Sequence, residues 1–236
     1  MPGYLVKHER IAIGGAADLT IRSLLDRQQF SDPLDAALRL GISSAAWPLF
    51  GLLWPSGRQL AAHMAVRPVR AGERILEIGC GLGLASLVSH RRGADMTASD
   101  CHPLAAGFLA ENLRLNGLPP MAYRHGHWTA SGSAAVAWAP GDPLSVQGRF
   151  DLIIGSDLLY ERDESASLAR FIARHAEPGA QVLIVDPDRG NRAAFSRQMG
   201  ALGYGVTQLR LDRAESDGLP AYKGRLLSYR QPATAR

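Results

Sequence analysis

From Arg74 onward, short apolar runs alternate with longer stretches in which apolar residues recur at helical spacing. Short strands separated by helices are typical of βαβ units, which build a parallel sheet. Five runs predict parallel strands: Ile75–Ile78, Ala94–Ser99, Met121–Arg124, Asp151–Gly155 and Gln181–Val185. The pattern therefore predicts an α/β fold.

Two helices and two further strands complete this pattern. The segment Leu104–Asn116 carries an apolar face, Pro103 suits its start and Gly117 its end, and a second helix is predicted near Ala193–Leu202. After it, two further strands are predicted with a polar loop between them: Tyr204–Leu211, the loop Asp212–Lys223, and Arg225–Tyr229. We expect these strands to form an antiparallel pair at one edge of the sheet.

The first 70 residues differ in character from the rest. They predict a hairpin over Leu5–Leu24 that turns at Gly14 and Gly15. With 236 residues and 46% hydrophobic content, one core suffices. We expect a single domain over 1–236, in which an N-terminal extension (1–70) shapes the acceptor site of a core (71–236).

Composition narrows the choice of partners and location. The net charge of +4 comes from basic residues scattered along the chain, and no window interleaves them with aromatics, so a nucleic-acid partner is not expected. The apolar window Ile42–Pro55 is interrupted by Pro48 and is shorter than the roughly 20 residues that span a bilayer. Without a visible secretory signal, and with only Cys80 and Cys101, the chain is expected to be cytoplasmic and free of disulfides.

The most specific motif follows the first predicted parallel strand. Gly79, Gly81 and Gly83 alternate just before a helix, and Glu77 precedes them. Glycines at a strand-to-helix turn let a ligand approach the backbone closely. This turn therefore predicts a ligand site.

Charge and spacing indicate which ligand binds. The dinucleotide pattern G-x-G-x-x-G fails, because Leu84 and Ser86 stand where its last glycine belongs. Glu77 would repel a diphosphate but attract an ammonium and a sulfonium, which favours S-adenosylmethionine over NAD. Asp100 ends the second strand, where a carboxylate accepts hydrogen bonds from ribose hydroxyls.

These residues resemble the first motif of the class I, or Rossmann-like, S-adenosylmethionine-dependent methyltransferases. Its pattern E/D-x-G-x-G-x-G is matched by Glu77, Gly79, Gly81 and Gly83. The resemblance covers residues 74 to about 229. It implies a seven-stranded, mostly parallel sheet of order 3-2-1-4-5-7-6, with an antiparallel seventh strand and helices on both faces.

The acceptor side is expected at the end of the fourth strand. Asp157 and Tyr160 follow that strand at the carboxyl edge of the sheet, where open α/β sheets carry their chemistry. Both are candidate catalytic residues, and Asp157 also a cofactor-binding one. The alternative is that Asp157 caps a helix and Tyr160 packs in the core.

The pattern Asp157-Leu-Leu-Tyr160, with Trp54-Pro55-Ser56-Gly57 upstream, resembles the family 16 protein lysine methyltransferases and the nicotinamide N-methyltransferase-like proteins. That group often has proline after the aspartate, where this chain has Leu158. The resemblance implies an acceptor amine, either a protein lysine or a nicotinamide-like heterocycle. It also implies that Trp128 lies near the adenine.

Three further features have two interpretations each. Trp54 contacts the cofactor or caps the acceptor channel, unless it packs in the core, and the same alternative holds for Trp128. The segment 186–190 either rims the acceptor pocket or is an ordinary turn. Cys101 and the histidines His102, His125 and His127 match no familiar zinc spacing, so no metal is expected.

Together these patterns predict an S-adenosylmethionine-dependent N-methyltransferase that transfers a methyl group directly to a protein lysine. Asp157 would orient the amine or stabilise its developing positive charge. The alternatives are methylation of a nicotinamide-like small amine, and a module that binds S-adenosylmethionine without catalysis.

Overall fold

The core of the protein is a seven-stranded sheet, seen in a computed structural model that describes residues 3–128, 144–160, 162–215 and 221–231. Its strand order is β5-β4-β3-β6-β7-β9-β8. The strands are β3 (Arg74–Ile78), β4 (Asp95–Asp100), β5 (Ala122–His125), β6 (Phe150–Ser156), β7 (Ala176–Asp186), β8 (Gly205–Arg210) and β9 (Arg225–Arg230). Strand β9 runs antiparallel to both of its neighbours, β7 and β8, whereas the pairs among β3 to β7 are parallel. Counted from β3, the order is 3-2-1-4-5-7-6, as predicted.

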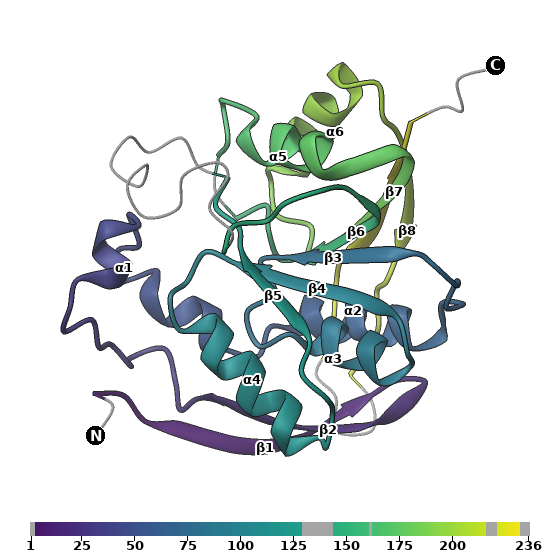
Figure 1. Cartoon of the computed structure of the whole chain (residues 1–236). Helices are drawn as coiled ribbons and strands as arrows, with labels where there is room; N and C mark the ends of the chain where they lie inside the picture. Colours follow the sequence, from purple (N-terminus) through teal and green to yellow (C-terminus); the bar gives the residue numbers. More distant parts are fainter. Residues whose placement is uncertain (1–2, 129–143, 161, 216–220, 232–236) are drawn as a thin grey trace.

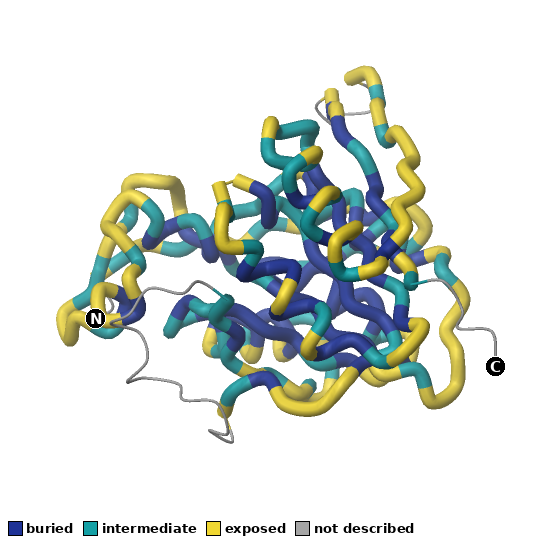
Figure 2. The backbone as a smooth tube through the Cα atoms, turned by 90° about the horizontal axis from the view of Figure 1, so that it is seen from above, coloured by how far each residue is buried: buried dark blue, intermediate teal, exposed yellow. Residues whose placement is uncertain are grey.

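Helices cover both faces of this sheet (Figure 1). They are α2 (Pro55–Val66), α3 (Leu84–Arg91), α4 (Ala105–Leu115), α5 (Ser167–His175) and α6 (Arg192–Ala201). Alternate strand residues face opposite sides: Ile75 and Leu152 pack in one core with α2, α3 and α4, whereas Leu76 and Ile153 pack in another with α5 and α6. Figure 2 shows these buried strands at the centre, surrounded by exposed loops.

The N-terminal segment forms the predicted hairpin and two short helical turns. Strands β1 (Val6–Ile13) and β2 (Ala16–Leu24) pair antiparallel around Gly14 and Gly15. The turns α1 (Ala36–Arg39) and η1 (Trp47–Gly51) follow. The hairpin packs against α4 and α2 instead of extending the main sheet, and in Figure 1 it runs beneath α4.

Two asparagines hold the edge of β2: Asn112 on α4 and Asn116, the residue that follows this helix. The Asn112 side chain accepts a hydrogen bond from the Arg22 amide at 2.8 Å, and its Nδ2 donates to the carbonyls of Arg22 and Leu82. One helical turn later, Asn116 accepts from the Thr20 amide at 2.9 Å and donates to the Thr20 carbonyl at 2.8 Å. The two side-chain amides therefore satisfy backbone groups that a neighbouring strand would otherwise pair.

The observed strands and helices mostly begin and end within one residue of the predicted bounds. The exception is β7, which starts at Ala176, whereas the prediction began at Gln181. Ala176 pairs with Phe150 before the register shifts, and Gly179 adopts φ +81° inside the irregular stretch. The sequence signal was missed because Pro178 and Gly179 interrupt the apolar run, whereas a bulge accommodates them.

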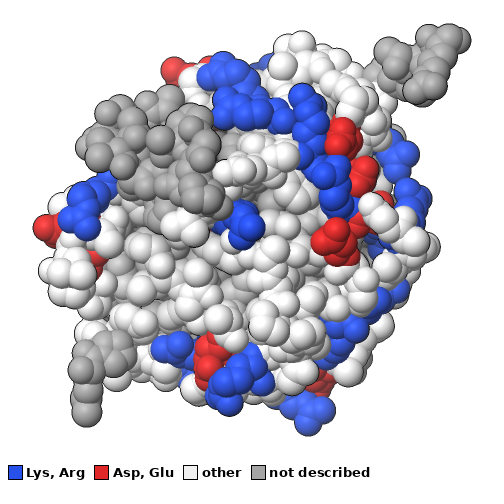
Figure 3. All heavy atoms as spheres, in the orientation of Figure 1, with Lys and Arg blue, Asp and Glu red and all other residues white. Residues whose placement is uncertain are grey.

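Charged side chains lie mostly around the rim of the face shown in Figure 3, with acidic residues among the basic ones. Its centre is largely uncharged. Across the part of the chain that the structure describes, no helix is both long enough and apolar enough to cross a membrane.

Candidate cofactor and acceptor site

A cavity of about 370 Å³ opens where the carboxyl ends of β3, β4 and β6 meet. This size falls within the range of small-molecule sites. All but one of the predicted site residues line it: Glu77, Gly79, Gly81, Asp100, Trp54, Trp128, Asp157 and Tyr160. Gly83 lies just beyond as the N-cap of α3. The topology thus gathers residues that are up to about 100 positions apart in sequence.

The glycine turn has a backbone that only glycine adopts readily. Gly79 and Gly81 have φ of +59° and +51°. A Cβ on Gly81 would lie 2.8 Å from the carbonyl oxygen of Phe50, which is closer than real Cβ atoms approach. The turn is therefore tightly packed against η1 of the N-terminal segment, as well as being open to the cavity.

Glu77 is buried at the base of the turn, with 3% of its surface exposed. Its Oε2 accepts hydrogen bonds from the Ser86 amide at 2.8 Å and from the Ser86 hydroxyl. Burial raises the pKa of Glu77 to about 7, although both bonds from Ser86 oppose the rise. Oε1 takes no part in these two hydrogen bonds, and Glu77 lines the cavity.

Asp100 connects β4 to the glycine turn. One of its carboxylate oxygens accepts from the Gly81 amide at 2.8 Å and the other from the His102 amide at 2.9 Å. Burial raises its pKa, and these amides counteract the rise. The carboxylate is thereby fixed in orientation at the wall of the cavity.

His102 also lines the cavity. The sequence analysis considered this residue only as a zinc ligand, and its spacing did not support that role. Its ring stacks on Phe50 with centroids 3.7 Å apart, and burial lowers its pKa to about 3. Nδ1 accepts the Leu104 amide at 3.2 Å, so the neutral ring carries its proton on Nε2. That nitrogen is buried and has no hydrogen-bond partner among the described residues.

Asp157 also lines the cavity and comes directly after β6. Its backbone has φ +56°, and its amide donates to the Val185 carbonyl at 3.0 Å. Burial raises the pKa of Asp157, while hydrogen bonds from Ser56 and the charge of Arg189 lower it. The interpretation of Asp157 as a helix cap is wrong, because α5 begins only at Ser167 and its first two amides donate to the Asp163 carboxylate.

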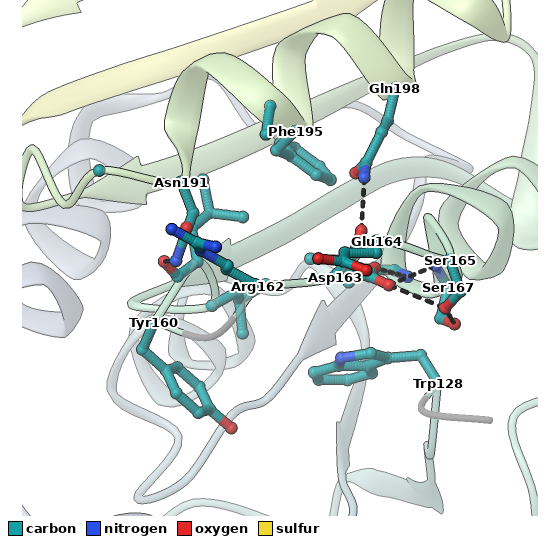
Figure 4. Close-up of a pocket in the computed structure, with 15 residues that line it drawn as sticks. Trp128, Tyr160, Arg162, Asp163, Glu164, Ser165, Ser167, Asn191, Phe195 and Gln198 are labelled. Carbon is teal, nitrogen blue, oxygen red and sulfur yellow. Dashed lines mark hydrogen bonds between the residues drawn. The ribbon is translucent and has the colours of Figure 1, made fainter. Parts of the chain in front are cut away.

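Tyr160 lines the same cavity, with 52% of its surface exposed. This exposure argues against the alternative that it packs in the core. A second cavity of about 670 Å³ adjoins the first through Trp128, Leu158 and Tyr160. Figure 4 shows Trp128 and Tyr160 on one side of it, with Phe195 and Gln198 of α6 on the other.

Trp54 and Trp128 both reach the first cavity. The indole nitrogen of Trp54 donates to the Leu49 carbonyl at 2.8 Å. A Cβ on Gly79 would lie 3.5 Å from the Trp128 ring, so this ring borders the glycine turn. The guanidinium carbon of Arg189 lies 5.8 Å from the centre of the Trp54 ring.

Much of the cavity wall comes from the N-terminal segment, of which the sequence analysis named only Trp54 as a lining residue. The lining residues from this segment are Arg27, Ile42, Ala46, Leu49, Phe50, Leu52, Trp54 and Gly57. Most belong to the apolar window Ile42–Pro55, in which the residues before Trp54 gave no sequence signal beyond an apolar run too short for a membrane span. Among the described residues, no group of three or more His, Cys, Asp and Glu side chains is placed to hold a metal ion.

The sheet order, the glycine turn and the paired acids define the class of Rossmann-like methyltransferases. The chain belongs to the family described as the methyltransferase domain, whose model matches residues 56–216.

Relatives and solved structures agree with this assignment. The chain is 29% identical over 145 residues to the mouse (Mus musculus) electron transfer flavoprotein beta subunit lysine methyltransferase, covering 60% of this chain and 51% of that protein. It is 31% identical over 147 residues to the zebrafish (Danio rerio) protein N-lysine methyltransferase METTL21A, covering 62% and 61%. The chain thus spans about half the length of the mouse relative.

A ribosomal protein L11 methylase from Lactobacillus delbrueckii subsp. bulgaricus has a similar fold, with a TM-score of 0.58 and 18% identity. The match covers 97% of this chain and 100% of that one.

Proposed function

We propose that this chain transfers a methyl group from S-adenosylmethionine to the side-chain amine of a lysine in a protein. The observation that carries the proposal is a single cavity with two sets of lining residues. Glu77 and Asp100 lie beside the glycine turn, and Asp157 and Tyr160 follow β6. The lysine methyltransferases among the relatives support the choice of acceptor.

The residues present fit this cofactor. Buried acids suit its sulfonium and ammonium groups, and the carboxylate of Glu77 borders the turn where the methionine end would lie. Asp100 would accept hydrogen bonds from the ribose hydroxyls. At the adenosine end, the Nε2–H of His102, which has no partner among the described residues, would donate a hydrogen bond to the edge of the adenine. The ring of Trp128 would stack on the face of the adenine.

Bound S-adenosylmethionine supplies an electrophilic methyl on a sulfur that leaves as a neutral thioether. The protein aligns the amine and excludes water. The acceptor ammonium gives up one proton to solvent, and its nitrogen lone pair then forms the new N–C bond. Asp157 stabilises the positive charge that this bond places on nitrogen, and Tyr160 lies on the acceptor side of the cavity.

Two wider roles accompany this proposal. The N-terminal segment 1–70 would form one wall of the acceptor site within a single domain, since it supplies Trp54 and much of the cavity lining. A cytoplasmic location would suit the two free thiols of Cys80 and Cys101.

The test uses methyl-labelled S-adenosylmethionine, the purified chain and a cell lysate, with a sample that lacks the chain as the control. Label on a protein band, located on lysine by mass spectrometry, supports the proposal. Label only on small amines such as nicotinamide would favour the heterocycle alternative. Cofactor binding by calorimetry without any transfer would indicate the non-catalytic module instead.

A further inference from the structure

An arginine of this chain stands where a cationic acceptor would be expected. The Arg189 guanidinium lies 3.2 Å from Oδ1 of Asp157 and 5.8 Å from the centre of the Trp54 ring. The three residues come from the turn after β7, the end of β6 and the start of α2. All three line the candidate cofactor cavity.

The acids around Arg189 are incompletely neutralised. Oδ2 of Asp157 and both carboxylate oxygens of Asp186 are buried without a hydrogen-bond partner of normal geometry among the described residues. Asp188 is engaged elsewhere, 2.9 Å from the Arg225 guanidinium and 3.8 Å from that of Arg192. The Arg189 guanidinium pairs with Asp157, whereas the buried Asp186 receives hydrogen bonds, within the described part of the chain, only from the backbone of Arg189 and Asp188, which lower its pKa while burial raises it to about 6.

Arg189 is also the most easily displaced member of this cluster. Its side chain is 38% exposed, whereas that of Asp157 is 10% exposed. The next residue, Gly190, is exposed. Moving the guanidinium into water costs little, because an exposed cation is already partly hydrated.

We propose that Arg189 occupies the subsite of the acceptor's ammonium group and is displaced from Asp157 when a cationic primary amine, such as a lysine side chain, enters. A carboxylate and an aromatic face together form a favourable site for such a cation. This inference rests on the proposed function. It selects the protein-lysine acceptor over a nicotinamide-like ring, because a neutral heterocycle has no charge with which to replace the guanidinium.

Competition by Arg189 predicts that its removal strengthens acceptor binding. The probe is n-butylammonium, added to the full chain saturated with S-adenosylhomocysteine and followed by NMR shifts. Arg189→Gln should bind the probe about 2- to 5-fold more tightly than the wild type, a range typical of one weak ion pair. Arg192→Gln is the matched control, because that arginine begins α6 three residues further along and lies outside the cavity, so the affinity of this variant for the probe should not change.

A neutral probe of similar shape, N-propylacetamide, should bind equally to both variants. Unchanged or weaker butylammonium binding in Arg189→Gln would overturn the inference while leaving the proposed function intact. Failure of the wild type to bind S-adenosylhomocysteine would contradict both. Equal melting temperatures of the two variants establish that both are folded.

Discussion

At the scale of single residues, Glu77 combines deep burial with a position beside the proposed cofactor. Its pKa of about 7 exceeds the ordinary value of 4.5 because the charged form loses hydration. Its contribution to stability is therefore complete below pH 4.5 and fades as the pH rises through 7. Burial favours the protonated carboxyl of Glu77, whereas a bound cation favours its charged carboxylate.

Cofactor binding near neutral pH should consequently release a proton from Glu77. We expect about half a proton at pH 7, with affinity rising between about pH 6 and 8. Calorimetry in phosphate and in Tris measures this release, because the two buffers differ in ionisation enthalpy. Glu77→Gln should abolish it, and equal proton release in this variant would assign the titration to another group.

Asp157 provides the second test at this scale. Asparagine tolerates the left-handed backbone that Asp157 adopts at φ +56°, so Asp157→Asn changes the charge with little change in geometry. We expect kcat to fall by about 10²-fold or more, with cofactor affinity changed less than about 3-fold. Steady-state assays with the identified acceptor measure both effects, and undiminished kcat would exclude a catalytic role for this carboxylate.

At the scale of elements, the glycine turn and η1 depend on each other. Gly81→Ala places a Cβ against the Phe50 carbonyl and also strains a φ of +51°. Gly93→Ala shares the positive φ, at +81°, but its Cβ meets nothing within 4 Å. The difference between the two variants therefore isolates the effect of the close contact.

We expect Gly81→Ala to lower the free energy of unfolding by about 1–3 kcal/mol more than Gly93→Ala. Cofactor binding should fail only in Gly81→Ala. Urea unfolding and calorimetry measure the two effects. Equal losses in both variants would mean that η1 moves aside freely.

The two asparagines that hold the edge of β2 give a further prediction, about the stability of the packing between the hairpin and α4. Asn112 is fully buried, so Asn112→Ala leaves the Arg22 amide without a partner and should cost about 1–3 kcal/mol. Asn116 is only partly buried, so water replaces part of what Asn116→Ala removes and the loss should be smaller. Hydrogen exchange at Arg22 and Thr20 distinguishes local opening from global unfolding. Equal losses of unfolding free energy in Asn112→Ala and Asn116→Ala would contradict the expectation that the first variant loses more.

Sequence patterns predicted nearly every strand of the main sheet, because burial on both faces of a parallel sheet leaves continuous apolar runs. The order of the strands came only from the family resemblance. The patterns also identified the acids and glycines of the site, since each lies at the carboxyl end of a strand or shortly after it. The sequence placed Arg189 only in a segment that either rims the acceptor pocket or forms an ordinary turn. It assigned the N-terminal extension to the acceptor site as a whole, but Trp54 was the one residue of that extension that it named as lining the site. These features depend on contacts between distant segments, such as Gly81 with Phe50, that no local pattern encodes.

At the scale of the whole molecule, a chain of net charge +4 concentrates buried acids at one edge of its sheet. Buried charges are screened by salt much less than exposed ones. The dissociation constant for S-adenosylmethionine should therefore change less than about 3-fold between 0.05 and 0.5 M NaCl. Calorimetry at both salt concentrations measures this, and a tenfold change would mean that surface charges dominate attraction.

The contact between Phe50 and Gly81 also constrains how such proteins diversify. The segment that differs most from the core in character contributes a backbone carbonyl to the packing of the cofactor turn. A new acceptor preference cannot simply be grafted by exchanging this segment, because every replacement must preserve that one carbonyl position. Substitutions in the side chains around Phe50 are the easier route to new specificity.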